Sequence, residues 1–276
     1  MQSPPNSSIG VFDSGFGVLT VLKELQKTLP YEQLIYFGDT ARLPYGTKSR
    51  DTIIRYTTQN CSFLAAQGVK LIIIACNTAT SMALDAVAGQ FTFPIVGVID
   101  PVIEKVIKTS PTGRIGILGT RATVISGVYQ QKIHDYLPHA DITAIASPLL
   151  VSLVEEGFID HPMTHLAIQE YVRPLLLAGV DTVILACTHF PLLKTLIEKA
   201  LGPAIKVIDP ALASAKATKK ALSELNLLSD EKNPLDPLFC VTDDPDKFKR
   251  LGPQFLGQSI THVKLCDTSY ILDQLR

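Results

Sequence analysis

Short apolar runs rich in valine and isoleucine alternate with longer amphipathic stretches along almost the whole chain. In the first part of the sequence, four runs have the length and composition of buried strands: Ile9–Phe12, Leu34–Phe37, Lys70–Ala75 and Ile95–Val98. The stretches between them have helical spacing and predict helices over Val18–Leu29, Arg50–Gln67 and Ala79–Gly89. Strands that alternate with helices in this way indicate an α/β fold of mostly parallel sheets, with helices on both faces.

The same alternation then begins again. The second series predicts, in order, strand Arg114–Leu118, helix Ala122–Tyr136, strand Asp141–Ile145, helices between Leu149 and Ala178, strand Asp181–Ala186, helix Leu192–Leu201 and strand Ala204–Ile208. Three segments recur in the same order: Ile9–Phe12 as Ile115–Leu118, Ile72–Cys76 as Val183–Cys187, and Val98–Pro101 as Val207–Pro210. One match could be a chance likeness between buried strands, but three in order indicate duplication of one set of βα units.

The repeat also predicts how the chain divides into domains. Each half ends at an Ile-Asp-Pro segment, where we expect the chain to cross between two pseudo-symmetric domains. A final piece is expected to complete the first sheet with helix Ala211–Leu225, strand Phe239–Thr242, helix Pro245–Leu251 and strand His262–Leu265. The predicted domains are therefore residues 1–99 plus 211–276, and residues 100–210. Because open α/β sheets bind ligands beyond the carboxyl ends of their strands, we expect the active site in the cleft between the two domains.

Charge and cysteine content argue against several classes of function. The chain carries 25 Lys+Arg against 26 Asp+Glu, so it has no electrostatic footprint for nucleic acid or a membrane surface. Met1–Ser8 lacks the features of a signal peptide and is expected to be a loose tail, and runs such as Leu71–Cys76 are too short to span a bilayer. Five scattered cysteines without a CxxC pair disfavour a disulfide framework and a structural zinc site. We therefore expect a cytoplasmic protein with reduced thiols and no metal.

Two of the cysteines stand at equivalent places in the repeat. Cys76 follows a predicted strand and precedes a helix, and Cys187 has the same setting. Free backbone N–H groups at a helix N-terminus favour the thiolate form of such a residue. A single cysteine at a strand end is more often just a small buried hydrophobic residue. Two at equivalent positions of a duplicated fold instead indicate one shared active site.

A pair of opposed thiols is suited to inverting a carbon centre. One base removes a proton from one face of the carbon, and an acid delivers a proton to the other face. A cysteine hydrolase needs only one thiol with a histidine partner, a description that Cys187 and His189 would fit. That alternative leaves Cys76 without a role.

Further polar residues follow the predicted strands. Asp13 follows the first predicted strand, at the same sheet edge as Cys76, where its carboxylate can hold or deprotonate a partner; the alternative is an ordinary turn or cap. The segment Gly38–Gly46 follows the second strand and either binds a carboxylate or is a plain connection. The glycines of Gly15-Phe16-Gly17 are expected to let the backbone approach a small ligand.

His161 and His165 are spaced i, i+4 and could in principle hold a metal ion together. The chain has no HExxH motif, and Pro162 is expected to begin a helix at this point. We therefore expect a pair of surface histidines.

Four motifs, taken together and in order, resemble those of the bacterial glutamate racemases in the cofactor-independent aspartate/glutamate racemase superfamily. They are Asp13-Ser14-Gly15, Gly38–Arg42 with Pro44-Tyr45-Gly46, Ala75–Ala79, and Cys187–Leu192. The resemblance extends from Ile9 to about Ser269. It implies the two-domain pseudo-symmetric fold that the repeat also predicts.

The resemblance implies interconversion of L- and D-glutamate without pyridoxal phosphate or any other cofactor, which supplies D-glutamate for peptidoglycan. By this likeness Cys76 and Cys187 are the acid/base residues, assisted by Asp13, His189 and Glu155, with the neighbouring Glu156 competing for the last role. The substrate-binding residues that it implies are Ser14, Pro44, Tyr45, Gly46, Asn77, Thr78 and Thr188. It also implies a homodimer, with glutamate as the small-molecule substrate.

Two residues depart from the pattern of this family. Val18 follows Gly17 where the family usually has another glycine, and Ala186 precedes the second cysteine where glycine is common. Both border the predicted cleft, so we expect an effect on loop geometry and rate. The residues by themselves leave open a racemase for aspartate or another acidic compound, and a protein that binds glutamate or a macromolecular partner without turnover.

Overall fold

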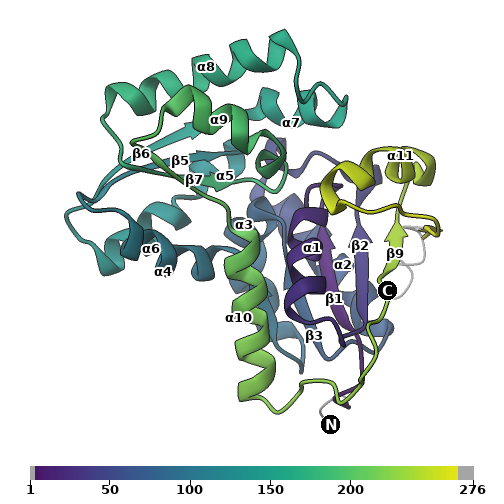
Figure 1. The fold of residues 1–276 in the computed structure, drawn as a ribbon. Helices are drawn as coiled ribbons and strands as arrows, with labels where there is room; N and C mark the ends of the chain where they lie inside the picture. The colour runs from purple at the N-terminus through teal and green to yellow at the C-terminus, as the bar shows by residue number, and fades with distance from the viewer. Residues whose placement is uncertain (1–3, 267–276) are drawn as a thin grey trace.

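The computed structural model describes residues 4–266, which form two separate parallel sheets flanked by helices (Figure 1). The first sheet has the strand order β10-β9-β2-β1-β3-β4 and the second has the order β6-β5-β7-β8. The strands are β1 (Ile9–Asp13), β2 (Leu34–Gly38), β3 (Leu71–Ile74), β4 (Ile95–Gly97), β5 (Arg114–Gly119), β6 (Asp141–Ala146), β7 (Thr182–Ala186), β8 (Lys206–Ile208), β9 (Leu238–Val241) and β10 (Lys264–Leu265). The predicted α/β class is confirmed.

Eleven α-helices and four 3-10 turns connect these strands within the described residues. The helices are α1 (Leu19–Thr28), α2 (Arg50–Ala66), α3 (Asn77–Val87), α4 (Ile99–Thr109), α5 (Arg121–Ser126), α6 (Val128–Tyr136), α7 (Pro148–Glu155), α8 (Pro162–Leu177), α9 (Lys194–Leu201), α10 (Ala211–Glu224) and α11 (Pro245–Leu256). The 3-10 turns are η1 (Thr40–Arg42), η2 (Tyr45–Thr47), η3 (Ala88–Gln90) and η4 (Phe190–Leu193). No helix in this part of the chain is both long and apolar enough to cross a membrane.

The two sheets repeat one strand order. In the first sheet the order β2-β1-β3-β4 corresponds to β6-β5-β7-β8 in the second, and every neighbouring pair is parallel. The central strand β1 lies between the strands that begin at Leu34 and Leu71, and its counterpart β5 lies between β6 and β7. Cys76 and Cys187 therefore follow equivalent strands, as the repeat predicts.

Each sheet is covered on both faces because its strands are apolar at successive positions. On β1, Ile9 and Val11 face a core with α1, α10 and α11, whereas Phe12 faces a core with α2 and α3. On β5, Ile115 and Ile117 pack against α4 and α6, and Leu118 packs on the side of α7, α8 and α9. Such burial of both faces explains why the strands are continuous apolar runs and not alternating ones.

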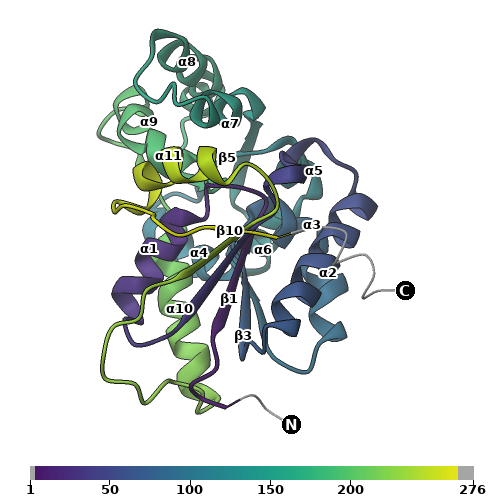
Figure 2. The same cartoon turned by 90° about the vertical axis from the view of Figure 1, so that its right-hand side faces the viewer.

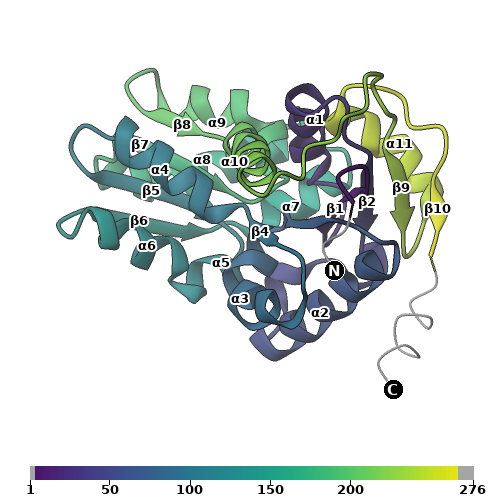
Figure 3. The same cartoon turned by 90° about the horizontal axis from the view of Figure 1, so that it is seen from below.

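The helices at the two Ile-Asp-Pro segments each pack against the half of the molecule that the chain enters next. Helix α4 comes directly after β4 of the first sheet, but its buried face packs with β5 and β7 of the second. Helix α10 comes after β8 of the second sheet and packs against α1 of the first, and the two helices also contact each other (Figure 3). The division into residues 1–99 plus 211–276 and residues 100–210 stays a prediction. Residues 1–3 and 267–276 of that first domain, and the resemblance beyond Cys266, lie outside the described residues.

Three local features differ from what the sequence predicted or were not predicted from it. The single helix expected over Ala122–Tyr136 is broken at Gly127, whose φ of 69° ends α5 in a left-handed cap. The first Ile-Asp-Pro segment lies within α4, where the sequence had predicted no helix; Pro101 is in the first turn of that helix, where its missing N–H removes no hydrogen bond of the helix. The described part of the expected loose tail is held in place, since Lys70 Nζ donates to the Pro5 carbonyl.

Candidate active site

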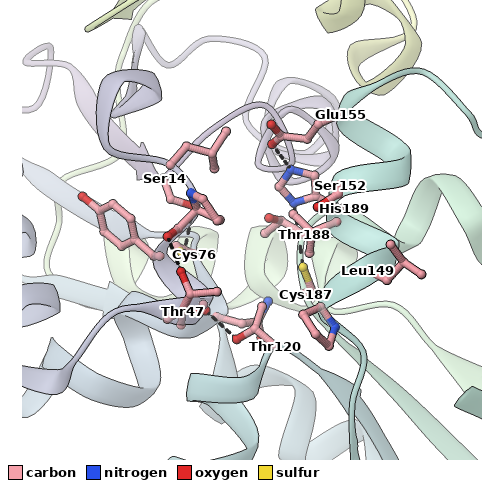
Figure 4. Close-up of a pocket in the computed structure, with 18 of the residues that line it drawn as sticks. Ser14, Thr47, Cys76, Thr120, Leu149, Ser152, Glu155, Cys187, Thr188 and His189 are labelled. Atoms are coloured by element: carbon pink, nitrogen blue, oxygen red, sulfur yellow. Dashed lines mark hydrogen bonds and ion pairs between the residues drawn. The ribbon is translucent and has the colours of Figure 1, made fainter.

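A cavity of about 470 Å³ opens where the carboxyl ends of both sheets meet (Figure 4). Its walls come from the segments after β1, β2 and β3 on one side and after β5, β6 and β7 on the other, with one residue from α11. The lining residues are Ser14, Thr40, Leu43, Pro44, Tyr45, Gly46, Thr47, Cys76, Asn77, Thr78, Thr120, Pro148, Leu149, Val151, Ser152, Glu155, Glu156, Cys187, Thr188, His189 and Lys247. Both thiols therefore line one cavity, each from a different sheet.

On the side of the second sheet, three residues form a chain of polar contacts. Cys187 Sγ lies 3.8 Å from His189 Nδ1, and His189 Nε2 lies 2.7 Å from Glu155 Oε1. Burial acts to lower the pKa of His189, but its hydrogen bonds to Cys187 and Glu155 outweigh burial and raise that pKa well above the ordinary value. A protonated His189 between a carboxylate and a sulfur atom stabilises negative charge on Cys187.

On the side of the first sheet, the thiol has different neighbours. Cys76 Sγ lies 3.6 Å from Ser14 Oγ, and Asp13 lies behind it, fully buried, with Oδ2 accepting from the Val18 amide at 3.1 Å. Burial, followed by the charge of Asp13, raises the pKa of the Cys76 thiol. Burial also raises the pKa of Asp13, although the charge of His189 opposes that shift. Cys76 is therefore held as a neutral thiol, with a carboxyl group nearby that can exchange a proton with it.

Hydrogen bonds join the two halves of the molecule next to Cys76. Thr78 Oγ1 lies 2.8 Å from Thr120 Oγ1, and the Tyr129 hydroxyl donates to Asn77 Oδ1 at 2.6 Å. Asn77 and Thr78 begin α3 directly after Cys76, whereas Thr120 and Tyr129 belong to the second half. These contacts orient Asn77 and Thr78 at the base of the cavity.

The segment from η1 to η2 is anchored to the first half by the buried carboxylate of Asp39. Arg42 Nε donates to both of its oxygens at 2.9 and 2.7 Å, and Asn60 Nδ2 donates to Oδ2 at 3.3 Å. The Tyr45 hydroxyl also donates to Asp39 and accepts from Asn60 Nδ2 at 2.9 Å. Tyr45 lines the cavity, but its hydroxyl group is bound to Asp39 and Asn60 within the fold.

The Gly15-Phe16-Gly17 segment lies against the other half of the molecule. A Cβ atom at Gly17 would overlap Thr188 Oγ1 and lie only 2.8 Å from His189 Nδ1. Gly17 thus allows the backbone to approach Thr188 and His189, which follow β7, whereas the sequence had indicated approach to a small ligand. Val18 has a φ of −65°, an ordinary helical value that needs no glycine, and Ala186 is fully buried in the core beside α4.

We predict that Gly17→Ala lowers any activity of this cavity by roughly tenfold to a hundredfold, because the added methyl group must displace Thr188 and His189. The matched control is Gly89→Ala, where a Cβ would meet nothing within 4 Å. Steady-state rates of both variants against the wild type measure the effect. Equal rates for Gly17→Ala and Gly89→Ala would contradict the close packing described above.

The cavity brings together eleven of the twelve residues that the sequence indicated, and Asp13 lies just behind its wall. Of the two competing acids, Glu155 is buried against His189, whereas the Glu156 side chain is 70% exposed. Sequence reasoning missed Thr120 and four of the five α7 residues that line the cavity, Pro148, Leu149, Val151 and Ser152, although they too follow strand ends. It also missed Lys247, which lines the cavity but belongs to none of the sequence motifs. His161 caps α8 and His165 contacts Asp160, both outside the cavity.

Fold and site together define a pseudo-symmetric α/β protein whose two halves each direct one thiol into a common cavity. The sequence model of the Asp/Glu/hydantoin racemase family matches residues 9–218. A protein of Syntrophus aciditrophicus named glutamate racemase is 45% identical over 95% of this chain and 97% of its own length.

Solved structures show the same likeness. The glutamate racemase of Francisella tularensis, in complex with D-glutamate, has a TM-score of 0.90 and 39% identity, covering 96% of this chain and 99% of its own. The Thermus thermophilus glutamate racemase, in complex with β-chloro-D-alanine, has a TM-score of 0.86 and 38% identity, covering 96% and 98%. The chain belongs to the Asp/Glu/hydantoin racemase family.

Proposed function

We propose that the chain is a glutamate racemase that interconverts L- and D-glutamate by proton transfer between Cys76, the substrate α-carbon and Cys187. The observation that carries this proposal is the pair of thiols, which follow equivalent strands of two sheets and line the same cavity. The names of relatives at 39 to 45% identity support glutamate as the substrate. Such a site needs no cofactor, because both proton transfers use the protein's own thiols.

The proton transfers balance across one turnover. A thiolate at one cysteine removes the α-proton, so that an S–H bond forms as the C–H bond breaks and the electron pair stays on the α-carbon and its carboxylate. The thiol of the other cysteine then donates its proton to the opposite face, and its sulfur atom is left as the thiolate. Preorganised hydrogen-bond donors must stabilise the carbanion-like charge, and we assign this role to the N–H groups at the start of α3 and after Cys187.

The neighbours of the two thiols set their starting protonation states. His189, with its raised pKa, lies 3.8 Å from the Cys187 sulfur atom, so we assign Cys187 as the base for one enantiomer. Cys76 begins as a thiol because of burial and the charge of Asp13, so it begins as the acid. For the opposite direction Asp13 takes the Cys76 proton and His189 returns one to Cys187. We assign Glu155 to the orientation of His189.

The remaining predictions from the sequence complete the proposal. Each predicted domain supplies one thiol, and Ser14, Pro44, Tyr45, Gly46, Asn77, Thr78 and Thr188 form the substrate-binding surface. Tyr45 would take part through its ring and backbone, because its hydroxyl is bound to Asp39. We propose further that the protein is a cytoplasmic homodimer and that its D-glutamate is used for peptidoglycan.

The test is racemisation by the purified protein without pyridoxal phosphate. With D-glutamate as substrate we expect ellipticity to decay to zero, and with L-glutamate to decay from the opposite sign to the same end point. D-aspartate serves as the competing substrate. Decay of ellipticity with aspartate and not with glutamate would show that aspartate is the substrate. Constant ellipticity with both amino acids would contradict a racemase.

A further inference from the structure

One positive side chain reaches the cavity from outside the motifs. Among the lining residues in the described chain, Lys247 is the single lysine or arginine; the hydroxyl groups of serine and threonine and the amide of Asn77 make up most of the other donors. Lys247 lies in the first turn and a half of α11, which the late part of the chain adds beside the first sheet (Figure 2). The cavity therefore receives one full positive charge that the thiol mechanism does not use.

The ion pair between Lys247 and Glu156 is long and partly exposed to solvent. Lys247 Nζ lies 4.0 Å from Glu156 Oε1, and the Glu156 side chain is 70% exposed, whereas that of Lys247 is 27% exposed. The ammonium group also lies 5.8 Å from the centre of the Phe16 ring, which holds it near the cavity. A long, exposed ion pair of this kind contributes little free energy, so Lys247 can leave Glu156 at small cost.

We propose that Lys247 is a substrate-recognition residue, whose ammonium group leaves Glu156 and binds a carboxylate of the substrate. This inference rests on the proposed function, since it requires an acidic amino acid as ligand. Glutamate carries two carboxylates and one ammonium group, so it enters the cavity with a net negative charge. A carboxylate inside the cavity is screened less by water than the exposed Glu156, and it is therefore the better partner for Lys247.

Two substitutions separate this role from a purely structural one, in which the ion pair only links α11 to the end of α7. Lys247→Met keeps the apolar stem and removes the charge, and Glu156→Gln removes the competing carboxylate. If the pair only held two elements together, both changes would break it and act in the same direction. If Lys247 exchanges partners, they act in opposite directions: the Kd for D-glutamate rises roughly tenfold in Lys247→Met and falls up to about threefold in Glu156→Gln.

The measurement is the Kd for D-glutamate by titration calorimetry on the full chain, accompanied by kcat and KM for racemisation. Lys247→Arg retains the charge and is expected to restore a Kd close to that of the wild type. Lys249→Met is the matched control, because Lys249 lies on the same helix, is exposed and pairs with Asp246 at 3.5 Å. We expect it to change neither the Kd nor the rates.

The outcomes are distinct. An unchanged Kd in Lys247→Met, or a raised Kd in both Lys247→Met and Glu156→Gln, would overturn the recognition role. A wild type that binds D-glutamate without racemising it would contradict the proposed function, yet the Kd values would still decide the role of Lys247. Salt gives an independent readout: the wild-type Kd should rise more steeply with ionic strength than that of Lys247→Met, since screening weakens only the charged contact.

Discussion

Replacing either Cys76 or Cys187 with serine is expected to lower racemisation about 10³-fold or more in both directions. A hydroxyl group is a far weaker acid than a thiol, and each turnover needs a base on one face of the α-carbon and an acid on the other. The two residues line one cavity from opposite halves of the molecule, so neither can replace the other. Cys240→Ser is the control, because Cys240 lies on β9 outside the cavity and should leave the rate unchanged.

The measurement is proton NMR of D-glutamate in D2O, followed together with ellipticity. In the wild type the α-hydrogen signal should disappear as the product enantiomer forms, because the proton that is delivered comes from a thiol equilibrated with solvent. Retention of activity in Cys76→Ser, with loss only in Cys187→Ser, would instead indicate a single-thiol site built on Cys187, His189 and Glu155.

Asp39→Ala is expected to lower the free energy of unfolding by about 3–5 kcal/mol, because it removes one partner of a buried ion pair and leaves the other uncompensated. Asp39 has no exposed surface and accepts hydrogen bonds from Arg42, Tyr45 and Asn60. The same residues hold the segment that brings Pro44, Tyr45 and Gly46 to the cavity, so racemisation should fall with stability.

Urea unfolding of Asp39→Ala against the wild type measures this effect. Glu170→Gln is the matched control: it also removes a carboxylate from an arginine, but the Glu170 and Arg173 side chains are each 67% exposed, and the expected loss is below about 1 kcal/mol. A loss for Asp39→Ala as small as that of the control would show that the segment is held by its other contacts.

Elements whose residues are close together in the sequence were predictable from it. The strands around Ile73 and Ile184 are short apolar runs rich in β-branched residues, which favour a strand, and one of the two cavity cysteines follows each run closely. Because the carboxyl ends of parallel strands share one edge, the repeat alone was sufficient to bring Cys76 and Cys187 to equivalent positions. The break at Gly127 was less predictable, since a glycine is tolerated within a helix unless its φ is positive.

Partners that lie far apart in the chain were decided only by the tertiary structure. Glu155 and Glu156 are neighbours in the sequence and chemically alike, but the position of α7 turns the first toward His189 and the second toward Lys247. The sequence therefore determined the two-sheet fold and the paired thiols, because both follow from local patterns and strand geometry. The protonation environment of each thiol and the presence of Lys247 at the cavity were decided by packing, because they depend on which side chains the two halves and α11 bring within a few ångströms.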